Sequence, residues 1–334
     1  MADGDARPQV DPVQVDPEGN TDAVDSSLGD DGFSHYSESL RSSVMQHRFE
    51  NGRRYHTRDS KWYVPNDEDE QDRMDVVHHL WKLLLGGELV KYKDRVDDWS
   101  RVLDVGTGTG IWAIEMADEH PEATVIGTDL SPIQPSWVPP NCHFYVEDAA
   151  QEWTFESPFS LIHTRMMSGS FPDWPLYYQR CFQNTKPGGV IEAHEYEFQI
   201  YNQGGEQPPA VGEFITSMIE ASTKLGSNVD IGHKHREWIQ AAGYENVEEV
   251  LFHVPLGTWA KEERLKEIGR YNMVQMVEGI GSYAAGALTA GLGRSIEDVN
   301  RLIAECKKEL LDKSFRHYVQ FRVVYGKKAK DGTE

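Results

Sequence analysis

Cysteine is scarce in this 334-residue chain, which has three, Cys142, Cys181 and Cys306, with no two close together in the sequence. That number and spacing exclude a disulfide framework and a cysteine-based zinc centre. The chain also lacks an apolar run of about 18 residues, which a membrane-spanning helix would need. Because its first residues, MADGDARPQV, hold no apolar signal core, we expect a cytoplasmic or nuclear protein without integral membrane contact.

Positive charge is also in short supply. Asp and Glu number 55 against 33 Lys and Arg, which gives a formal net charge of −22. The densest basic stretch is Arg53, Arg54, Arg58 and Lys61. Since an acidic chain without a basic cluster repels phosphate backbones, we do not expect direct nucleic-acid binding.

Three regions follow from composition and periodicity. Residues 1–32 hold nine acidic residues, one Arg and no aromatic residue, so they are predicted to be a disordered acidic tail, either simply solvated or an interaction arm. Residues 33–98 are predicted to form a helical extension, with a break at residues 63–66 and a helix over 67–85. Residues 99–334 are predicted to be the main domain.

The main domain begins with strands that alternate with helices. The strands are predicted at 101–105, 123–129, 142–146, 159–164 and 189–195, and the helices at 110–119 and 172–184. This alternation predicts an α/β fold with a parallel sheet that is covered on both faces. Later helices at 211–225, 233–242, 261–292 and 296–311, with strands at 246–254 and 317–325, place helical insertions at about 204–228 and 256–314.

A glycine-rich turn follows the first strand of this domain. Gly106, Gly108 and Gly110 stand between the strand and the helix, and glycines there allow a tight turn and a close approach by a ligand. A dinucleotide fold would need Gly where Ile111 stands, and a phosphate loop would need a Lys that is missing. The pattern that remains is Asp-x-Gly-x-Gly-x-Gly.

Three acidic residues stand where successive strands end, namely Asp104, Asp129 and Asp148. Open α/β sheets bind ligands at the carboxyl ends of their strands, and a carboxylate at Asp129 can accept both hydroxyls of a ribose. The alternative is that these acids cap helices or turns. Because all three stand in register at strand ends, we expect Asp104, Asp129 and Asp148 to face a ligand.

The glycine turn resembles the first motif of class I S-adenosylmethionine-dependent methyltransferases. Residues 63–67, 125–141, 162–166, 170–175 and 186–189 are further similar to a fungal methyltransferase family that includes secondary-metabolism regulators and velvet-associated methyltransferases. The resemblance implies a Rossmann-like sheet with an N-terminal helical extension and a helical lid insertion near the C-terminus. It implies S-adenosylmethionine as the cofactor, with Asp104 near its ammonium and Asp148 facing its adenine. The implied cofactor residues are Tyr63, Asp104, Gly106, Thr107, Gly108, Gly110, Asp129, Leu130, Asp148, Ala149, Arg165 and Met166.

The same resemblance implies a methyltransferase that acts on a secondary metabolite or on a protein. The alternative it leaves open is a regulatory subunit with a methyltransferase fold that acts through a velvet-type transcription-regulator complex, because a fold alone does not settle function.

A phenol or acid acceptor would have to lose its proton, so a general base is needed. His163, His194 and Glu195 are candidates because they lie on strands near the expected pocket, although each could equally be a hydrogen-bonded structural residue. The stripe of Tyr271, Met273, Met276, Ile280 and Tyr283 could be core or a lid over an apolar acceptor. No metal-ligand pattern is visible in the sequence, so no metal is predicted.

Overall fold

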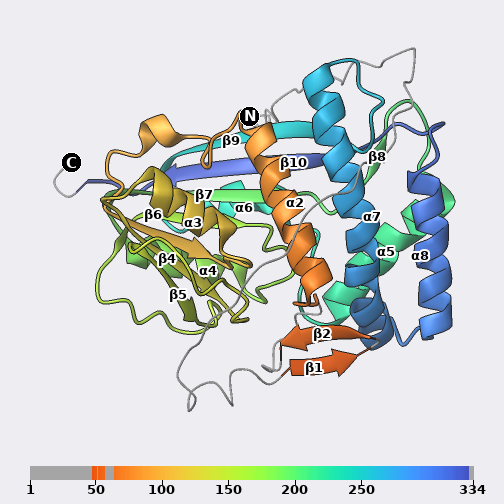
Figure 1. Cartoon of the computed structure of the whole chain (residues 1–334), viewed down its shortest axis with the longest axis horizontal. Coiled ribbons are helices and arrows are strands. Elements are labelled where there is room, and N and C mark those ends of the chain that lie inside the picture. The colour runs from red at the N-terminus through yellow and green to blue at the C-terminus, as the bar shows by residue number, and fades with distance from the viewer. Residues whose placement is uncertain (1–46, 51, 57–63, 331–334) are drawn as a thin grey trace, which may run out of the picture.

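The computed structural model describes residues 47–50, 52–56 and 64–330 (Figure 1). The predicted acidic tail, residues 1–32, lies outside them. None of the helices in the described ranges is both long and apolar enough to cross a membrane.

A mixed sheet forms the centre of the described chain, with the strand order β5-β4-β3-β6-β7-β10-β8 and with β9 paired to β10. The strands are β3 (Arg101–Val105), β4 (Thr124–Asp129), β5 (Cys142–Val146), β6 (Phe159–Arg165), β7 (Thr185–Tyr196), β8 (Tyr201–Asn202), β9 (Glu245–Pro255) and β10 (His317–Lys327). The first five strands of the order are parallel, whereas β10 runs antiparallel to β7, β8 and β9. The predicted α/β class with a parallel sheet is confirmed.

The chain leaves β3 to build β4 and β5 on one side and then returns to add β6 on the other side. Neighbouring connections therefore diverge between β3 and β6, and a crevice opens outside the carboxyl ends of these two strands. Both strands are almost wholly buried, as expected for parallel strands covered on both faces. This topology positions the glycine turn, which directly follows β3, at the mouth of the crevice.

The helices are α2 (Glu68–Leu84), α3 (Ile111–Glu119), α4 (Trp174–Asn184), α5 (Pro209–Lys224), α6 (His235–Ala241), α7 (Glu263–Leu292) and α8 (Ile296–Leu310), with short 3-10 turns η1 (Lys93–Arg95) and η2 (Gly232–Lys234). They match the predicted helices, with ends that differ by a few residues. Helices α5, α7 and α8 gather at one end of the molecule, and α2 crosses in front of the long strands β7, β9 and β10 and packs against α7 (Figure 1).

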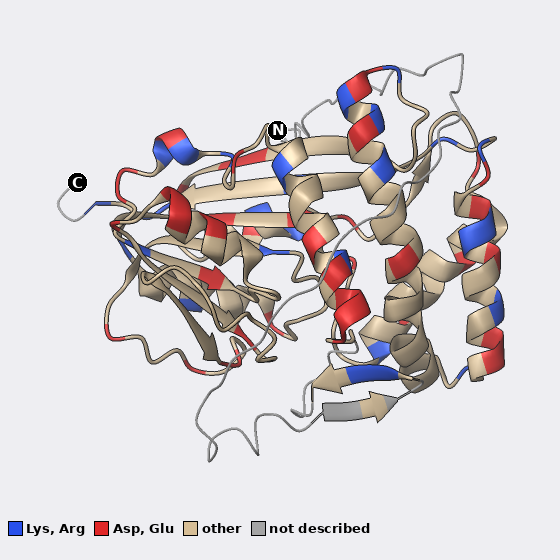
Figure 2. Ribbon diagram, in the orientation of Figure 1, with Lys and Arg blue, Asp and Glu red and all other residues tan. Residues whose placement is uncertain are grey.

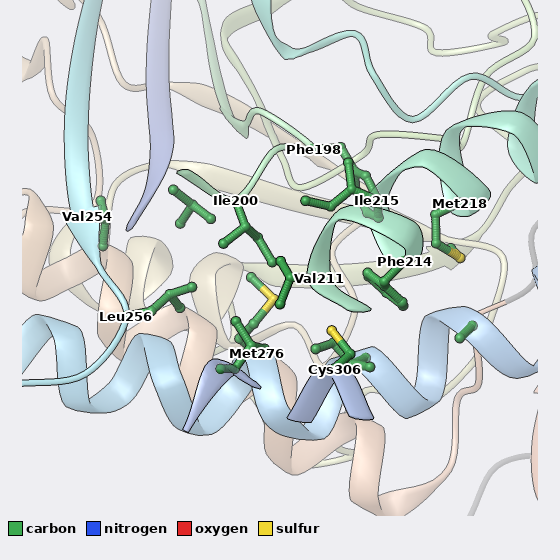
Figure 3. Packing of buried hydrophobic residues seen from close by; sticks show 14 of the residues in the cluster. Phe198, Ile200, Val211, Phe214, Ile215, Met218, Val254, Leu256, Met276 and Cys306 are labelled. Atoms are coloured by element: carbon green, nitrogen blue, oxygen red, sulfur yellow. The ribbon is translucent and has the colours of Figure 1, made fainter. Parts of the chain in front are cut away.

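A hydrophobic core joins these four helices to the sheet. Phe198 and Ile200 pack with Phe214 and Met218 of α5 and with Met276 of α7 (Figure 3). The outer face of α8 remains polar, with acidic and basic residues interspersed along it (Figure 2). The helical layer is therefore anchored to the domain by apolar packing, and it faces the same crevice as the glycine turn.

The start of the N-terminal extension departs from the helical prediction, whereas the helix predicted over 67–85 is present as α2. Residues His47–Glu50 and Arg53–His56 form an antiparallel hairpin, β1 and β2, that turns through Gly52 at a φ of +79°. Arg53 holds the hairpin on α2, because its Nε and Nη2 atoms lie 2.6 and 2.7 Å from the carboxylate of Asp67, the N-cap residue of α2. The acidic first turn of α2 is visible in Figure 2. Tertiary ion pairing of this kind leaves no periodic signal in the sequence.

Candidate functional site

A cavity of about 240 Å³ lies between the carboxyl ends of the parallel strands and the helical layer. Its wall on the sheet side comes from the loops after β3, β4, β5 and β6, and its opposite wall comes from α2, α5 and α7. Nine of the predicted cofactor residues line it, namely Gly106, Thr107, Gly108, Asp129, Leu130, Asp148, Ala149, Arg165 and Met166.

The glycine turn reaches this cavity because its backbone adopts conformations that other residues avoid. Gly106, Gly108 and Gly110 have φ values of +68°, +59° and +82°. A Cβ on Gly110 would also lie 2.4 Å from the ring of Phe144, so the spacing of the glycines is set by packing as well as by conformation. Gly110 caps α3 and does not line the cavity.

Asp129 ends β4 with its carboxylate on the cavity wall. The carboxylate accepts hydrogen bonds from the backbone N–H groups of Gly108 and Ser131, both at 2.9 Å. Burial raises the pKa of Asp129 to about 6, although the two N–H donors oppose the effect. The side chain thus ties the glycine turn to the β4 loop, as the capping alternative has it, and because Asp129 lines the cavity its contact with a ligand stays a prediction.

Asp148 follows β5 on the same wall. It accepts hydrogen bonds from the Ala150 N–H at 2.9 Å and from Gln151 Nε2 at 3.3 Å. Opposite it, Asn66 precedes α2 and donates to Ser131 Oγ at 3.1 Å, which connects the N-terminal extension to the β4 loop. Asn66 is a cavity residue that the sequence reasoning did not select.

Asp104 is not on the cavity wall. Its buried carboxylate accepts a hydrogen bond from Thr107 Oγ1 at 2.6 Å and lies 2.7 Å from Nδ1 of His163. Burial raises the pKa of Asp104 to about 6. Asp104 thus holds the glycine turn in place through its hydrogen bond with Thr107. Its contact with a cofactor ammonium stays a prediction. Tyr63, also predicted to bind the cofactor, lies outside the described residues.

The three candidate bases all lie behind the cavity wall rather than on it. His163 stacks on Trp112 with ring centres 3.8 Å apart, and its Nε2 lies 3.4 Å from Nδ1 of His194. His194 in turn lies 2.6 Å from Glu192. Burial holds the pKa of His163 well below its usual value. These contacts place both histidines in a buried chain that starts at Asp104; neither lines the cavity, and a role as general base stays a prediction.

Glu195 holds the loop that follows β6 in place by hydrogen bonds. Its carboxylate accepts hydrogen bonds from the Met167 N–H and from Ser168 Oγ, the latter at 2.8 Å. Met166, at the start of this loop, has a φ of +57°, which is unusual for a residue with a side chain. Because Met166 and Met167 line the cavity, Glu195 shapes the site indirectly, and its pKa is raised to about 7 by burial.

The raised pKa of Glu195 predicts a pH dependence of stability. Between its usual value of 4.5 and about 7, the folded protein keeps a proton that the unfolded chain has lost. The free energy of unfolding should therefore fall as pH rises through this window, by up to about 1.4 kcal/mol per pH unit for one proton. Glu195→Gln should make the fall shallower in urea titrations, whereas Glu156→Gln at an exposed position should not. An unchanged slope for Glu195→Gln would contradict the assignment.

Arg165 supplies positive charge at the end of β6. Its guanidinium lines the cavity and lies 3.2 Å from Nδ1 of His78 on α2. Burial lowers the pKa of Arg165 to about 10 and that of His78 to about 4, so at neutral pH the arginine is charged and the histidine neutral. A cation beside the glycine turn can hold a carboxylate of a ligand.

The wall formed by the helices carries a second polar group, which the sequence did not reveal. Glu70 and Arg73 stand one turn apart on α2, both buried, with Nη2 of the arginine 2.6 Å from the carboxylate. Tyr196 and Tyr283 line the cavity beside them, and for Tyr283 this agrees with the lid alternative for its stripe rather than the core alternative. The i, i+3 spacing of Glu70 and Arg73 is visible in the sequence, but it resembles an ordinary surface pair.

A possible metal grouping lies outside the cavity lining, where the segment after β7 meets η2. Within the described ranges, Glu197, Asp230 and His233 bring ligand atoms within 4.8 Å of one another. Arg322 already lies 3.4 Å from Glu197 and would repel a cation.

The cavity as a whole suits two molecules. One would place a polar end at the glycine turn and be held there by hydrogen bonds, and the other would lie against the helices.

Comparison with known protein families gives one match over most of the chain. Residues 10–249 match the model of a family described as a methyltransferase domain. Among curated proteins, the chain is 37% identical over 295 residues to methyltransferase pytC of Aspergillus terreus, covering 87% of this chain and 90% of that protein.

Other relatives carry regulatory names. The chain is 34% identical to the secondary metabolism regulator LAE1 of Cochliobolus heterostrophus, covering 80% of this chain and 91% of that protein. It is 31% identical to the protein-methionine methyltransferase laeA of Emericella nidulans, covering 87% and 79%. Solved structures include YcgJ of Bacillus subtilis, at 14% identity and a TM-score of 0.47, covering 76% of this chain and 99% of that one.

Proposed function

This chain belongs to the methyltransferase-domain family, and from that premise we propose that it transfers a methyl group from S-adenosylmethionine to a small-molecule or protein acceptor bound in the cavity. One observation carries the proposal. The loops after four parallel strands bring nine of the residues that the sequence predicts for this cofactor onto the wall of one cavity at the switch point of the sheet.

The residues present fit this cofactor in shape and charge. The positive φ angles of Gly106 and Gly108 keep that part of the wall free of side chains, which suits the amino-acid part of the molecule. Arg165 suits its carboxylate, Asp129 its ribose hydroxyls and Asp148 its adenine amino group. We assign these roles as proposals.

When bound, S-adenosylmethionine supplies the methyl group and a good leaving thioether, so the protein mainly has to align two molecules. In the proposed arrangement the glycine turn and Asp129 fix the position of the donor, and the loop at Met166 and Met167 separates it from the helical wall. His163 and Glu195 act through the shape of the site, because neither reaches the cavity.

The cavity favours a small acceptor or a single side chain, since helices α2, α5 and α7 enclose the space opposite the glycine turn. The name of the relative laeA, a protein-methionine methyltransferase, supports a protein acceptor, whereas the name of methyltransferase pytC supports methyl transfer without specifying the acceptor.

The second candidate is a regulatory protein that works in the cytoplasm or nucleus through a velvet-type transcription regulator. Relatives named as secondary metabolism regulators support it. The two candidates differ in turnover. A stable complex with such a regulator in a pull-down, together with no S-adenosylhomocysteine release in the presence of candidate acceptors, would favour the regulatory role.

Cofactor binding is the direct test of the proposed function. Isothermal titration calorimetry should give one S-adenosylhomocysteine per chain, because one cavity holds the whole set of proposed contacts. NAD should give no heat, since its pyrophosphate has no glycine at position 111 to approach. Binding of NAD without binding of S-adenosylhomocysteine would refute the proposal.

A further inference from the structure

Helix α2 contacts the donor side of the cavity as well as the helical wall. It lies between α3 and α7 and contacts both (Figure 1). Its residues Leu80 and Leu84 join the core of the helical layer. His78, on the same helix, contacts Arg165 at the end of β6 instead. Helix α2 therefore touches the residue that we propose to bind the cofactor's carboxylate.

Arg165 is a partly buried cation whose carboxylate neighbours are engaged elsewhere. Burial lowers the pKa of Arg165 to about 10, although Asp104, Glu115 and Asp75 act to raise it. Each of these three carboxylates lies within hydrogen-bond distance of another residue, namely Thr107 at 2.6 Å, Lys82 at 2.6 Å and Thr109 at 2.7 Å, respectively. A desolvated charge that its own protein compensates only in part favours a ligand of opposite charge. Arg165 therefore favours an anionic group in the cavity that it lines.

His78 is the neighbour that orients Arg165. Nη1 and Nη2 of the guanidinium both lie 3.2 Å from Nδ1 of His78. Because a guanidinium can only donate hydrogen bonds, Nδ1 has to be the acceptor, and a neutral His78 carries its proton on Nε2. A guanidinium has more N–H donors than this one ring nitrogen can accept, so Arg165 keeps donors for a ligand.

Glu115 on α3 favours this form of His78. Its Oε2 lies 3.2 Å from Nε2 of His78, although the two atoms are not aligned for a full hydrogen bond. The same oxygen lies 2.6 Å from Nζ of Lys82, which holds the carboxylate in place. A negative charge at this position favours the proton on Nε2 and leaves Nδ1 free to accept. Burial, and after it the charge of Arg165, lowers the pKa of His78 to about 4, so the ring is neutral at neutral pH.

We propose that His78 is a positioning residue, which holds the guanidinium of Arg165 in the orientation that binds the carboxylate of the cofactor's amino-acid part. This inference rests on the proposed methyltransferase function. His78 acts through Arg165, because His78 itself does not line the cavity. Helix α2 of the N-terminal extension then takes part in binding the methyl donor, in addition to enclosing the space for the acceptor.

The test compares two ligands by isothermal titration calorimetry with the full-length protein. They are S-adenosylhomocysteine and S-adenosyl-3-thiopropylamine, which has the same adenosine and amine but no carboxylate. His78→Leu keeps an apolar side chain of similar size and removes the acceptor. It should weaken binding of S-adenosylhomocysteine about tenfold, the size of one charge-assisted hydrogen bond, and leave the affinity for the amine nearly unchanged.

His79→Leu is the matched control, because His79 is the next residue of the same helix and is exposed. It should change neither affinity. A double variant tests whether His78 acts through Arg165. In protein that already carries Arg165→Met, adding His78→Leu should weaken binding of S-adenosylhomocysteine no further, since a positioning residue has no effect without the group that it positions.

A second variant and a spectroscopic measurement keep the test decisive if His78→Leu does not fold. Glu115→Gln, at a partly exposed position, should weaken binding of S-adenosylhomocysteine by less than His78→Leu and again spare the amine. Nitrogen-15 NMR of histidine-labelled wild-type protein should show the proton of His78 on Nε2.

Four results would each overturn the inference. They are unchanged binding in His78→Leu, equal losses for the two ligands, additive losses in the double variant, and a proton on Nδ1 of His78. Failure of the proposed function gives a different result, because the wild-type protein would then bind neither S-adenosylhomocysteine nor the amine.

Discussion

Replacing Asp129 by alanine is expected to weaken S-adenosylhomocysteine binding by about one to two orders of magnitude. The change removes the carboxylate proposed to accept the ribose hydroxyls, and charge-assisted hydrogen bonds contribute roughly 1.5–3 kcal/mol each. It also frees the backbone N–H groups of Gly108 and Ser131, which the carboxylate now satisfies. The protein without ligand should therefore lose about 1 kcal/mol of stability as well.

Asp129→Asn is the matched control, because it keeps one acceptor oxygen in nearly the same shape. It should give an intermediate loss of affinity and a smaller loss of stability. Calorimetry and thermal melts of the same preparations measure both quantities. A drop in stability with unchanged affinity for S-adenosylhomocysteine would leave Asp129 with a capping role alone.

The sheet could be predicted from the sequence because buried parallel strands leave a local signal. Short apolar runs at 101–105 and 159–164 are separated from each other by glycines and helix-forming segments, and the structure has β3 and β6 at these positions. The hairpin at residues 47–56 left no such signal, since its strands are stabilised by a contact between Arg53 and Asp67, 14 positions apart.

The sheet side of the site could be predicted for the same reason. Strand order brings Gly106, Asp129 and Asp148 to one edge once the strands are placed. The direction of the candidate bases could not be predicted. Alternation along β6 and β7 shows that successive side chains face opposite sides of the sheet, but it does not show which side faces the cavity. Trp112 takes the position beside His163, which leaves that histidine behind the wall.

The helical side of the site could not be predicted, since it depends on the packing of helices far apart in the chain. Arg73 and Gln275 are separated by 202 positions and meet through the contact of α2 with α7. Neither residue type nor spacing distinguishes the buried Glu70–Arg73 pair from a solvated pair on a helix surface. A buried pair and a solvated pair differ in how much they contribute to the free energy of unfolding, and that contribution can be measured.

Removing one member of the buried Glu70–Arg73 pair is expected to cost about 3–5 kcal/mol of folding stability. Arg73→Met leaves the carboxylate of Glu70, which is 0% exposed, without its cation. Glu70→Leu removes the carboxylate that pairs with Arg73, whose guanidinium then keeps its hydrogen bond to Oε1 of Gln275, at 3.1 Å. In both variants a charge loses its partner at a buried position.

The double variant Glu70→Leu with Arg73→Met should be far more stable than the sum of the two losses, because it leaves no unpaired charge and fills the space with apolar atoms. Urea unfolding of the four proteins closes the cycle. The control is Arg301→Met, which breaks an exposed pair with Asp298 at the same i, i+3 spacing and should change stability little. Additive losses for Glu70 and Arg73 would mean that the pair is not coupled in the folded protein.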